Sequence, residues 1–387
     1  MGQVLQVLAK RLELKLRADG TPANPVAVVL LEEWRDAPLA DTWRACTMIA
    51  GALPITVATL VGPPSPQQEM LMAAATLTLA HDMPRFGPAK TAAEREQLPQ
   101  TIVHIGDLPG DPDPAGALER LRAAADRSPR AAIACAQLLR QTARLGTGEG
   151  LAAEAAAYSM LLGGPEFARW LAERGPRRDR ELVAEPLLVS RDGGRLSITL
   201  NDPARRNAFS AAVREALHDA VAVALADDTV ESVELRGAGP TFCSGGDLDE
   251  FGQATDLAAA YLGRLSRAPW RVIDKIAPKV TVFVQGACIG AGVEIAAYAD
   301  RVIAAPNAFF ALPEVGMGLV PGAGGSVSVP RRIGRWRAAW LMLTGDRLPA
   351  ATALRWGLVD EVAKTGHLTR GALGCRLFFG QPPQRRD

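Results

Sequence analysis

Short apolar runs alternate with amphipathic stretches along most of the chain, which predicts strands alternating with helices. The strands are expected at residues 26–31, 53–62, 101–105, 233–236, 280–284 and 301–305. The helices are expected at residues 67–81, 116–145, 150–172, 210–226 and 292–299. A hairpin is expected where residues 187–191 and 196–200 flank the turn Asp192-Gly193-Gly194. This alternation indicates a layered α/β fold.

Length, composition and charge narrow the classes of function. A chain of 387 residues, 48% of them hydrophobic, is long enough for two domains with large cores. A net charge of +1 and 5% aromatic residues offer neither a basic field nor a stacking surface for nucleic acid. No charge-free apolar stretch of about 20 residues occurs, so no membrane span is expected. The five cysteines lack CxxC spacing and the four histidines lie apart, so we expect no metal site, reduced thiols and a cytoplasmic location.

The loop at residues 241–248 follows an expected strand and contains the glycine pair Gly245-Gly246. Paired glycines allow unusual backbone angles and close approach of a ligand to backbone N–H groups. Such a loop can donate a hydrogen bond to an oxygen on which negative charge develops. On its own, this loop is equally consistent with a plain tight turn.

Two glutamates stand beside other small-residue turns. Glu294 lies in the first turn of an expected helix, where unpaired N–H groups suit an anionic oxygen, although it can also serve only as a cap. Glu314 lies among apolar residues, where desolvation is expected to raise its pKa and suit proton exchange near neutral pH. In isolation, Glu314 is also compatible with a solvent-facing loop. The Gly-rich stretch at 316–325 lacks the GKS/T ending of a nucleotide triphosphate loop.

In this order, the three segments closely resemble the enoyl-CoA hydratase/isomerase (crotonase) superfamily. The likeness runs from residue 187 to residue 362, and several further segments agree with it in register. They are residues 201–209, 299–305, 343–347 and 354–360. The resemblance implies a crotonase-like core, in which ββα repeats wind into a spiral.

The resemblance also implies roles for individual residues. The backbone N–H groups of Gly246 and Ala291 would form an oxyanion hole for a thioester carbonyl. Glu294 would act mainly on water and Glu314 mainly as the acid. The CoA and acyl channel would be lined by Arg206, Ala208, Ser244, Asp247, Leu248 and Asp249.

The implied reaction is the addition of water across the 2,3 double bond of an acyl-CoA thioester. No cofactor is expected beyond the coenzyme A of the substrate, and the family resemblance implies a homo-oligomer, either a trimer or a hexamer. Two alternatives stay open. One is an isomerase or a C–C hydrolase, acting on another acyl-CoA or on a diketone, that uses the same hole. The other is a non-catalytic scaffold subunit.

The first half of the chain carries no comparable motif. The charged Gly/Pro segment at 173–180 suggests a boundary between domains at 1–180 and 181–387. Residues 53–81 resemble residues 279–299, and matching Gly62 to Gly286 places Met70 where the second half has Glu294. We therefore expect a degenerate crotonase-like copy without the carboxylate, the alternative being an unrelated α/β appendage.

The helices expected at 116–172 end the first half, and residues 148–172 resemble the C-terminal helices of the family. Only 25 residues (387 − 362) follow Val362, which is short for the usual helical tail. The helices are therefore expected to pack on the second half, or on a neighbouring chain, in place of that tail.

Overall fold

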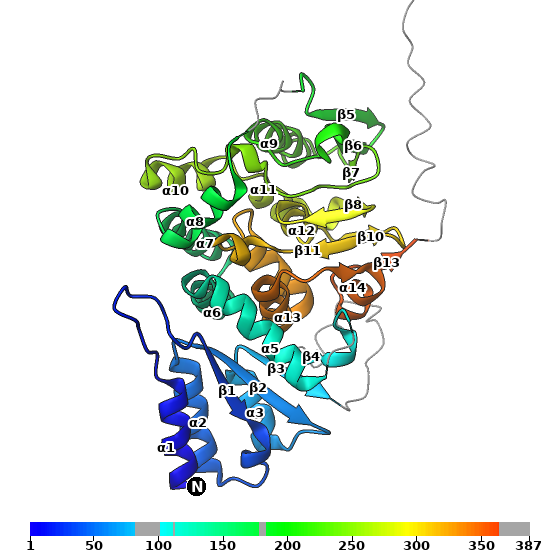
Figure 1. Cartoon of the computed structure of the whole chain (residues 1–387). Coiled ribbons are helices and arrows are strands. Elements are labelled where there is room, and N and C mark those ends of the chain that lie inside the picture. Colours follow the sequence, from blue (N-terminus) through cyan, green and yellow to red (C-terminus); the bar gives the residue numbers. More distant parts are fainter. Residues whose placement is uncertain (82–100, 111–112, 178–182, 364–387) are drawn as a thin grey trace, which may run out of the picture.

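The computed structural model describes residues 1–81, 101–110, 113–177 and 183–363. These residues form a four-stranded sheet in the first half and a six-stranded and a three-stranded sheet in the second. The four-stranded sheet lies in the lower part of Figure 1, and the six-stranded sheet lies above it. No described helix is long and apolar enough to cross a membrane.

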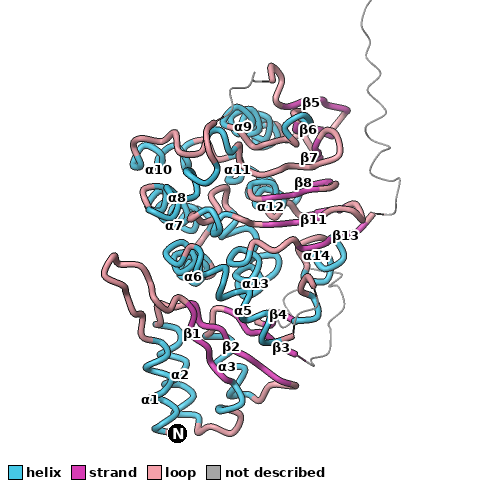
Figure 2. Tube along the Cα trace, in the orientation of Figure 1, coloured by secondary structure: helices cyan, strands magenta, loops and turns pink. Residues whose placement is uncertain are grey.

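The sheet of the first half is parallel throughout, with its strands in sequence order (Figure 2). Its strands are β1 (Val26–Leu30), β2 (Ile55–Val61), β3 (Leu77–His81) and β4 (Ile102–His104). The helices that accompany it are α1 (Gly2–Leu12), α2 (Leu39–Gly51) and α3 (Pro66–Ala74). The first half is therefore α/β, as the alternation predicts.

One predicted element of this sheet is wrong. The helix expected at 67–81 ends at Ala74, and the remaining residues form β3, which lies between β2 and β4. Every residue of β3 except His81 is buried. A short apolar run that is buried on both faces has no distinctive period, so a helical reading of it is easily made.

The second half contains the remaining strands. The large sheet has the order β13-β10-β8-β7-β6-β5, and the small sheet has the order β12-β11-β9. Their bounds are β5 (Leu187–Asp192), β6 (Arg195–Leu200), β7 (Ser232–Gly237), β8 (Val280–Val284), β9 (Ala287–Ile289), β10 (Arg301–Ala304), β11 (Phe309–Ala311), β12 (Leu348–Pro349) and β13 (Glu361–Val362). The antiparallel pair β5–β6 confirms the predicted hairpin.

The helices of the second half surround these sheets. They are α9 (Ala211–Ala226), α10 (Leu257–Ser266), α11 (Pro269–Ile276), α12 (Ala291–Ala296), α13 (Gly325–Thr344) and α14 (Ala350–Trp356). The helices predicted at 210–226 and 292–299 correspond to α9 and to the slightly shorter α12.

Four helices join the two halves, where the sequence predicts two long ones. They are α5 (Pro114–Arg127), α6 (Pro129–Thr142), α7 (Thr147–Leu162) and α8 (Pro165–Arg174). The predicted continuity is wrong because Pro129 and Pro165 each begin a new helix. Proline has no N–H and fits the first helical position, but it interrupts a helix interior.

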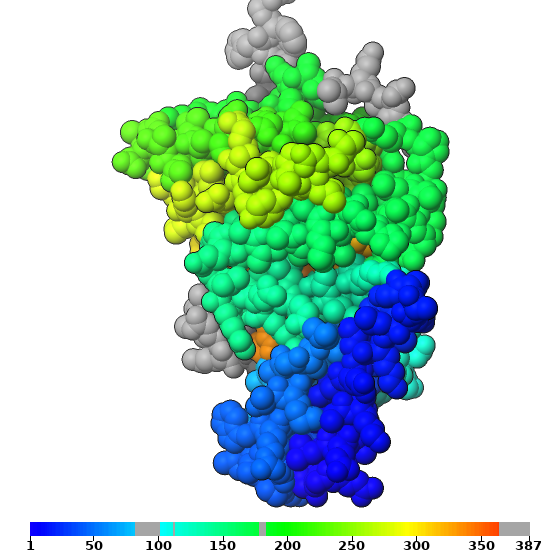
Figure 3. Space-filling model, turned by 90° about the vertical axis from the view of Figure 1, so that its left-hand side faces the viewer, coloured from blue at the N-terminus to red at the C-terminus, as the bar shows by residue number. Residues whose placement is uncertain are grey.

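These helices pack on the second half, which confirms that prediction. Helix α6 lies against α13, and α7 lies against α10 and α13. A single buried apolar cluster continues from β2 and β3 through α5–α8 into the second half. In Figure 3 the helices form a band between the blue N-terminal part and the yellow-green part. Replacement of the family's tail stays a prediction, as does the division at residue 180.

The degenerate-copy hypothesis finds a parallel in the topology. The order β1-β2-β3-β4 matches β7-β8-β10-β13 in direction and in neighbour relations. Gly62 and Gly286, which the sequence comparison pairs, follow β2 and β8 and have φ angles of 70° and 56°. The first half is not all-helical, which would have refuted the hypothesis, but the degenerate copy and the unrelated α/β appendage both remain open.

Candidate active site

A cavity of about 240 Å³ opens where α7 meets the second half. It collects residues from both halves of the chain. The lining comprises Tyr158, Leu162, Phe209, Ser210, Ala211, Arg214, Gly246, Asp247, Glu250, Phe251, Gly252, Ala254, Arg264, Trp270, Ala291, Glu294, Glu314, Gly322 and Ala323. Both predicted hole residues, both predicted acid/base glutamates and Asp247 therefore meet in one place.

Backbone pairing positions the N–H group of Gly246. The Phe209 N–H donates to Gly245 O (2.8 Å) and the Asp247 N–H donates to Phe209 O (3.1 Å). Because successive N–H groups of an extended segment alternate in direction, the Gly246 N–H points away from Phe209. Gly246 lines the cavity, and the use of its N–H group as an oxyanion donor there stays a prediction.

The second hole residue stands at a helix start. Ala291 is the first residue of α12, so its N–H has no acceptor within the helix. The preceding Gly290 has a φ of 50°, and its N–H donates to Ala311 O (2.9 Å). A Cβ atom at Gly290 would lie 2.5 Å from Glu314 Oε1, so a larger residue would displace the carboxyl group, and the positive φ itself favours glycine.

Glu294 is buried and anchored by backbone donors. The N–H groups of Ala323 and Gly325 both donate to its Oε2, at 2.7 and 2.8 Å. Burial raises the pKa of Glu294 well above its usual range, and the nearby carboxyls of Glu314 and Glu154 raise this pKa further. The two N–H donors act in the opposite direction, because they favour the ionised form.

Glu314 begins a short 3₁₀ turn (Glu314–Met317) after β11. Its side chain is buried, and among the described residues its Oε2 has no hydrogen-bond partner. Burial raises the pKa of Glu314 to about 8. A carboxyl with one uncommitted oxygen and such a pKa can hold a proton at neutral pH and deliver it.

A third carboxyl, which the sequence analysis does not single out, belongs to Glu154 of α7. Its Oε1 accepts the Gly324 N–H (2.7 Å), and its Oε2 accepts the N–H and the Oγ–H of Ser326 (2.8 and 2.6 Å). Burial raises the pKa of Glu154 to about 7. The signal in the sequence is its place on the buried face of α7, beside Leu151 and Ala155.

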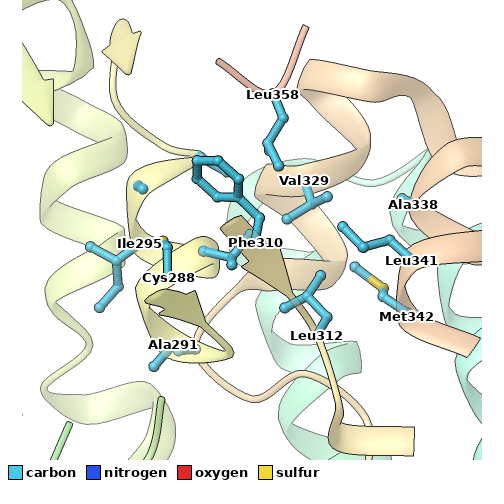
Figure 4. Close-up of a cluster of buried hydrophobic side chains, with 14 of the residues drawn as sticks. Cys288, Ala291, Ile295, Phe310, Leu312, Val329, Ala338, Leu341, Met342 and Leu358 are labelled. Carbon is cyan, nitrogen blue, oxygen red and sulfur yellow. The ribbon is translucent and has the colours of Figure 1, made fainter. Parts of the chain in front are cut away.

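The core behind the site is apolar and closely packed. Figure 4 shows Phe310 of β11 among side chains of β9, α12 and α13, with Ile295 and Val329 on two sides of it. Phe310, Leu312 and Ile295 are almost fully buried. This surrounding medium of low polarity is the physical reason why carboxyls at the cavity wall resist ionisation.

Comparison with known proteins shows which family the second half resembles. The family model described as "Enoyl-CoA hydratase/isomerase" matches residues 191–376. The 2,3-dehydroadipyl-CoA hydratase of Escherichia coli (strain K12) is 35% identical over 46% of this chain and 68% of its own length. The 1,2-epoxyphenylacetyl-CoA isomerase of the same organism is 36% identical over 46% of this chain and 70% of its own length.

The chain belongs to the enoyl-CoA hydratase/isomerase family. The predicted crotonase-like fold of the second half is thereby confirmed, and the protein is an enzyme of this family. Among solved structures, the enoyl-CoA hydratase of Bacillus anthracis is 29% identical, covering 49% of this chain and 74% of its own, with a TM-score of 0.45. Residues 1–190, which supply Glu154, lie outside the family match.

The other residues that the family resemblance assigns to the substrate channel lie outside the cavity lining. They are Arg206, Ala208, Ser244, Leu248 and Asp249. Asp247 does line the cavity, but its carboxylate pairs with Arg205, and Asp249 pairs with Arg174 and Arg205. Ser244 Oγ donates to Arg205 O (3.3 Å). These contacts hold the loop in shape, and a channel role for these residues stays a prediction.

The site also contains aromatic and cationic groups that sequence reasoning missed. Arg264 of α10 stacks on the ring of Tyr158, with its Cζ 3.6 Å from the ring centroid. Both residues line the cavity, as do Arg214 and Trp270. Within the described part of the chain, no group of three or more His, Cys, Asp and Glu side chains is suited to hold a metal ion.

Proposed function

We propose that the enzyme adds water across the 2,3 double bond of a 2-enoyl-CoA thioester. The observation that carries this proposal is the meeting of Glu294 and Glu314 in one cavity with Gly246 and Ala291. Hydration needs one group that takes a proton from water and another that supplies a proton to carbon. Two buried carboxyls beside unpaired N–H donors offer both functions.

The N–H groups of Gly246 and Ala291 would bind the thioester oxygen and stabilise the enolate-like state that forms when water adds at C3. Preorganised donors of this kind are typically worth about 10²–10³ in rate each. The proposal needs no cofactor besides the coenzyme A carried by the substrate. A homo-oligomeric assembly remains a prediction.

The two glutamates differ in their hydrogen bonds, and this difference supports a division of labour. Glu294 Oε2 accepts two N–H groups, which stabilise its ionised form, so Glu294 would take the proton from water. Glu314 has an uncommitted oxygen and a raised pKa, so it would deliver a proton to C2. When two carboxyls interact strongly, their apparent pKa values belong to the pair and not to either residue. At the working pH, Glu294 and Glu314 would therefore hold one proton between them.

Loss of the enone absorbance of crotonyl-CoA tests this proposal. We expect Glu294→Gln and Glu314→Gln each to lower the hydration rate by about 10²–10⁴, the usual contribution of general acid–base catalysis. Glu166→Gln is the matched control, because Glu166 is also buried and also accepts two backbone N–H groups, but does not line the cavity. Near-normal rates in both active-site variants would refute the mechanism.

A double-bond isomerase is the second candidate. The relative named 1,2-epoxyphenylacetyl-CoA isomerase, 36% identical to this chain, supports isomerase chemistry on an acyl-CoA, and a shift of the double bond is the form of it that a 2-enoyl-CoA substrate allows. An isomerase returns a proton to another carbon of the same acyl group and incorporates no oxygen from water. Detection of a shifted double bond, with no hydroxyacyl product, would therefore replace hydration with isomerisation.

A further inference from the structure

The N–H groups at the start of α13 alternate between two carboxyls. Those of Ala323 and Gly325 donate to Glu294, and those of Gly324 and Ser326 donate to Glu154. One turn therefore binds a carboxyl on each of its sides. Glu294 comes from α12 of the second half, whereas Glu154 comes from α7 and is separated from Ser326 by 172 residues.

The N-cap Gly324 and the first two helical residues, Gly325 and Ser326, have N–H groups that a helix start leaves without an intrahelical acceptor, and the two carboxyls accept all three of them. The partial positive charge at the helix N-terminus also favours negative charge nearby. Glu154 accepts a third hydrogen bond, from the hydroxyl of Ser326. Tyr298 also stabilises the same turn, because its OH donates to Gly324 O (3.1 Å). Of the two carboxyls on this turn, Glu154 thus has the more complete hydrogen bonding.

We propose that Glu154 is a positioning residue of the active site: its carboxyl group fixes the turn 323–326 that anchors Glu294, and in its ionised form it retains the shared proton on the Glu294–Glu314 pair. The proposal rests on the proposed function, in which that pair carries the acid and the base. Glu154 itself does not line the cavity, so it would act through its neighbours.

The groups around Glu154 determine the sign of its effect. They come from α6, α7, α10, α12 and the turns that follow α12 and β11, and they are Cys135, Tyr158, Arg264, Glu294, Tyr298 and Glu314. Arg264 is a cation and favours ionised Glu154. Ionised Glu154 in turn raises the pKa of both Glu294 and Glu314, because like charges oppose each other. Removing its charge should therefore lower both of these pKa values.

Glu166 supplies a matched structural comparison. It is 3% exposed, and its carboxylate accepts the N–H groups of Arg130 and Ala131 at the start of α6, at 2.9 and 3.0 Å. Glu154 and Glu166 thus use the same device at two helix starts. Of these two residues, Glu154 adjoins the two glutamates of the cavity wall and Glu166 does not. Comparing variants of Glu154 and Glu166 therefore separates the effect of capping a helix from an effect on the site.

The test compares pH–rate profiles for crotonyl-CoA hydration. We expect Glu154→Gln to move the optimum to lower pH by roughly one unit, the lower end of the shift caused by a close charge. Glu154→Asp, which keeps the charge, should keep the optimum while the rate falls. Glu166→Gln should leave the optimum in place. An unchanged optimum in Glu154→Gln, or an equal shift in Glu166→Gln, would overturn the proposal.

A milder variant covers the case in which Glu154→Gln does not fold. Ser326→Ala removes one donor to Glu154 and leaves all carboxyls in place, so we expect a smaller shift in the same direction. Ser328→Ala is its control, because Ser328 Oγ donates to the backbone carbonyl of Glu294 instead (2.8 Å). Equal profiles for the two serine variants would count against Glu154.

An infrared titration of the carboxyl C=O band separates this proposal from the proposed function. The titration reports protonated carboxyls in the intact protein without any turnover. We expect the bands lost in Glu294→Gln and Glu314→Gln to titrate at lower pH when Glu154→Gln is added. If this shift is present but crotonyl-CoA is not turned over, the hydratase function is refuted and the role of Glu154 stands. If the titration is unchanged, the role of Glu154 is refuted.

Discussion

At the scale of single residues, the site is defined by three carboxyls with graded hydrogen bonding. Glu154 accepts three donors and Glu294 accepts two, while Glu314 Oε2 accepts none among the described residues. Hydrogen-bond donors to a carboxylate favour its ionised form. The different numbers of donors therefore shift the pKa values of the three carboxyls by different amounts, although burial raises all three. The separation is what an acid and a base in one cavity require.

The raised pKa of Glu314 makes the stability of the protein depend on pH. Between its unfolded value of 4.5 and its folded value of about 8, the folded protein retains a proton that the unfolded chain has released. Stability should therefore fall as pH rises through this window, by at most about 1.4 kcal/mol per pH unit for this group. Glu314→Gln removes that contribution, so its unfolding free energy should decline less from pH 5 to pH 8. Parallel curves in chemical denaturation would contradict this.

Gly290 holds the turn that lies against the carboxyl group of Glu314. A methyl group there would lie 2.5 Å from Glu314 Oε1 and would stand on a backbone with a φ of 50°. We expect Gly290→Ala to lose most of the hydration rate and about 1 kcal/mol or more of stability. Gly263→Ala is the control, since its methyl group would meet nothing within 4 Å. Equal activities of the two variants would contradict this account of the turn.

The sequence identifies Gly246, Ala291, Glu294 and Glu314 as candidates because their segments occur in family order, and the structure brings them to one cavity. None of them is decisive alone, since each also fits a turn, a cap or a surface position. Glu154 escapes this reasoning because its partner Ser326 is 172 residues away. Only its position on the largely apolar buried face of α7 points to it.

At the scale of elements, the contact of α7 with α13 decides where Glu154 lies. A Cβ atom at Gly150 would approach Val327 Cγ2 to 2.8 Å, so the two helices meet without room for a methyl group. Gly150→Ala should push α7 outward, at a cost of about 1–3 kcal/mol, and lower the hydration rate. Gly148→Ala, on the same helix but with nothing within 4 Å, should not. Thermal unfolding and turnover of both variants check this.

Most elements are predictable from the period of apolar residues, and the errors have physical causes. The strand β3 is buried on both faces, so its run gives no alternation that separates it from a continuing helix. The breaks before Pro129 and Pro165 come from proline chemistry within alanine-rich segments. Amphipathic α9 and the hairpin β5–β6, by contrast, have clear patterns and lie where the sequence places them.

At the scale of the whole molecule, the two halves of the sequence share one apolar core. Polar contacts join them as well: Asp107 accepts from Arg355 Nη2 (2.7 Å) and from Trp356 Nε1 (3.1 Å). A second half made alone would expose the faces of α10 and α13 that α6 and α7 cover. It would also lack Tyr158 and Leu162 of the cavity wall.

We therefore expect residues 183–387 expressed alone to aggregate and to show no hydration of crotonyl-CoA. Co-expression with residues 1–177 should restore a soluble complex and measurable activity, because both faces of the shared core are then present. Size-exclusion chromatography with turnover of the pooled complex measures this. A fully active fragment 183–387 would show instead that the second half is an independent domain.

The most direct test of hydration by two carboxyls in one cavity follows the atoms of water. Crotonyl-CoA is incubated with the enzyme in deuterated water enriched in ¹⁸O, and the product is analysed by mass spectrometry and NMR. We predict a 3-hydroxyacyl-CoA with ¹⁸O at C3 and deuterium at C2, and almost none in Glu294→Gln or Glu314→Gln. An acyl-CoA that carries deuterium but no ¹⁸O, or product formed equally well by both variants, would contradict it.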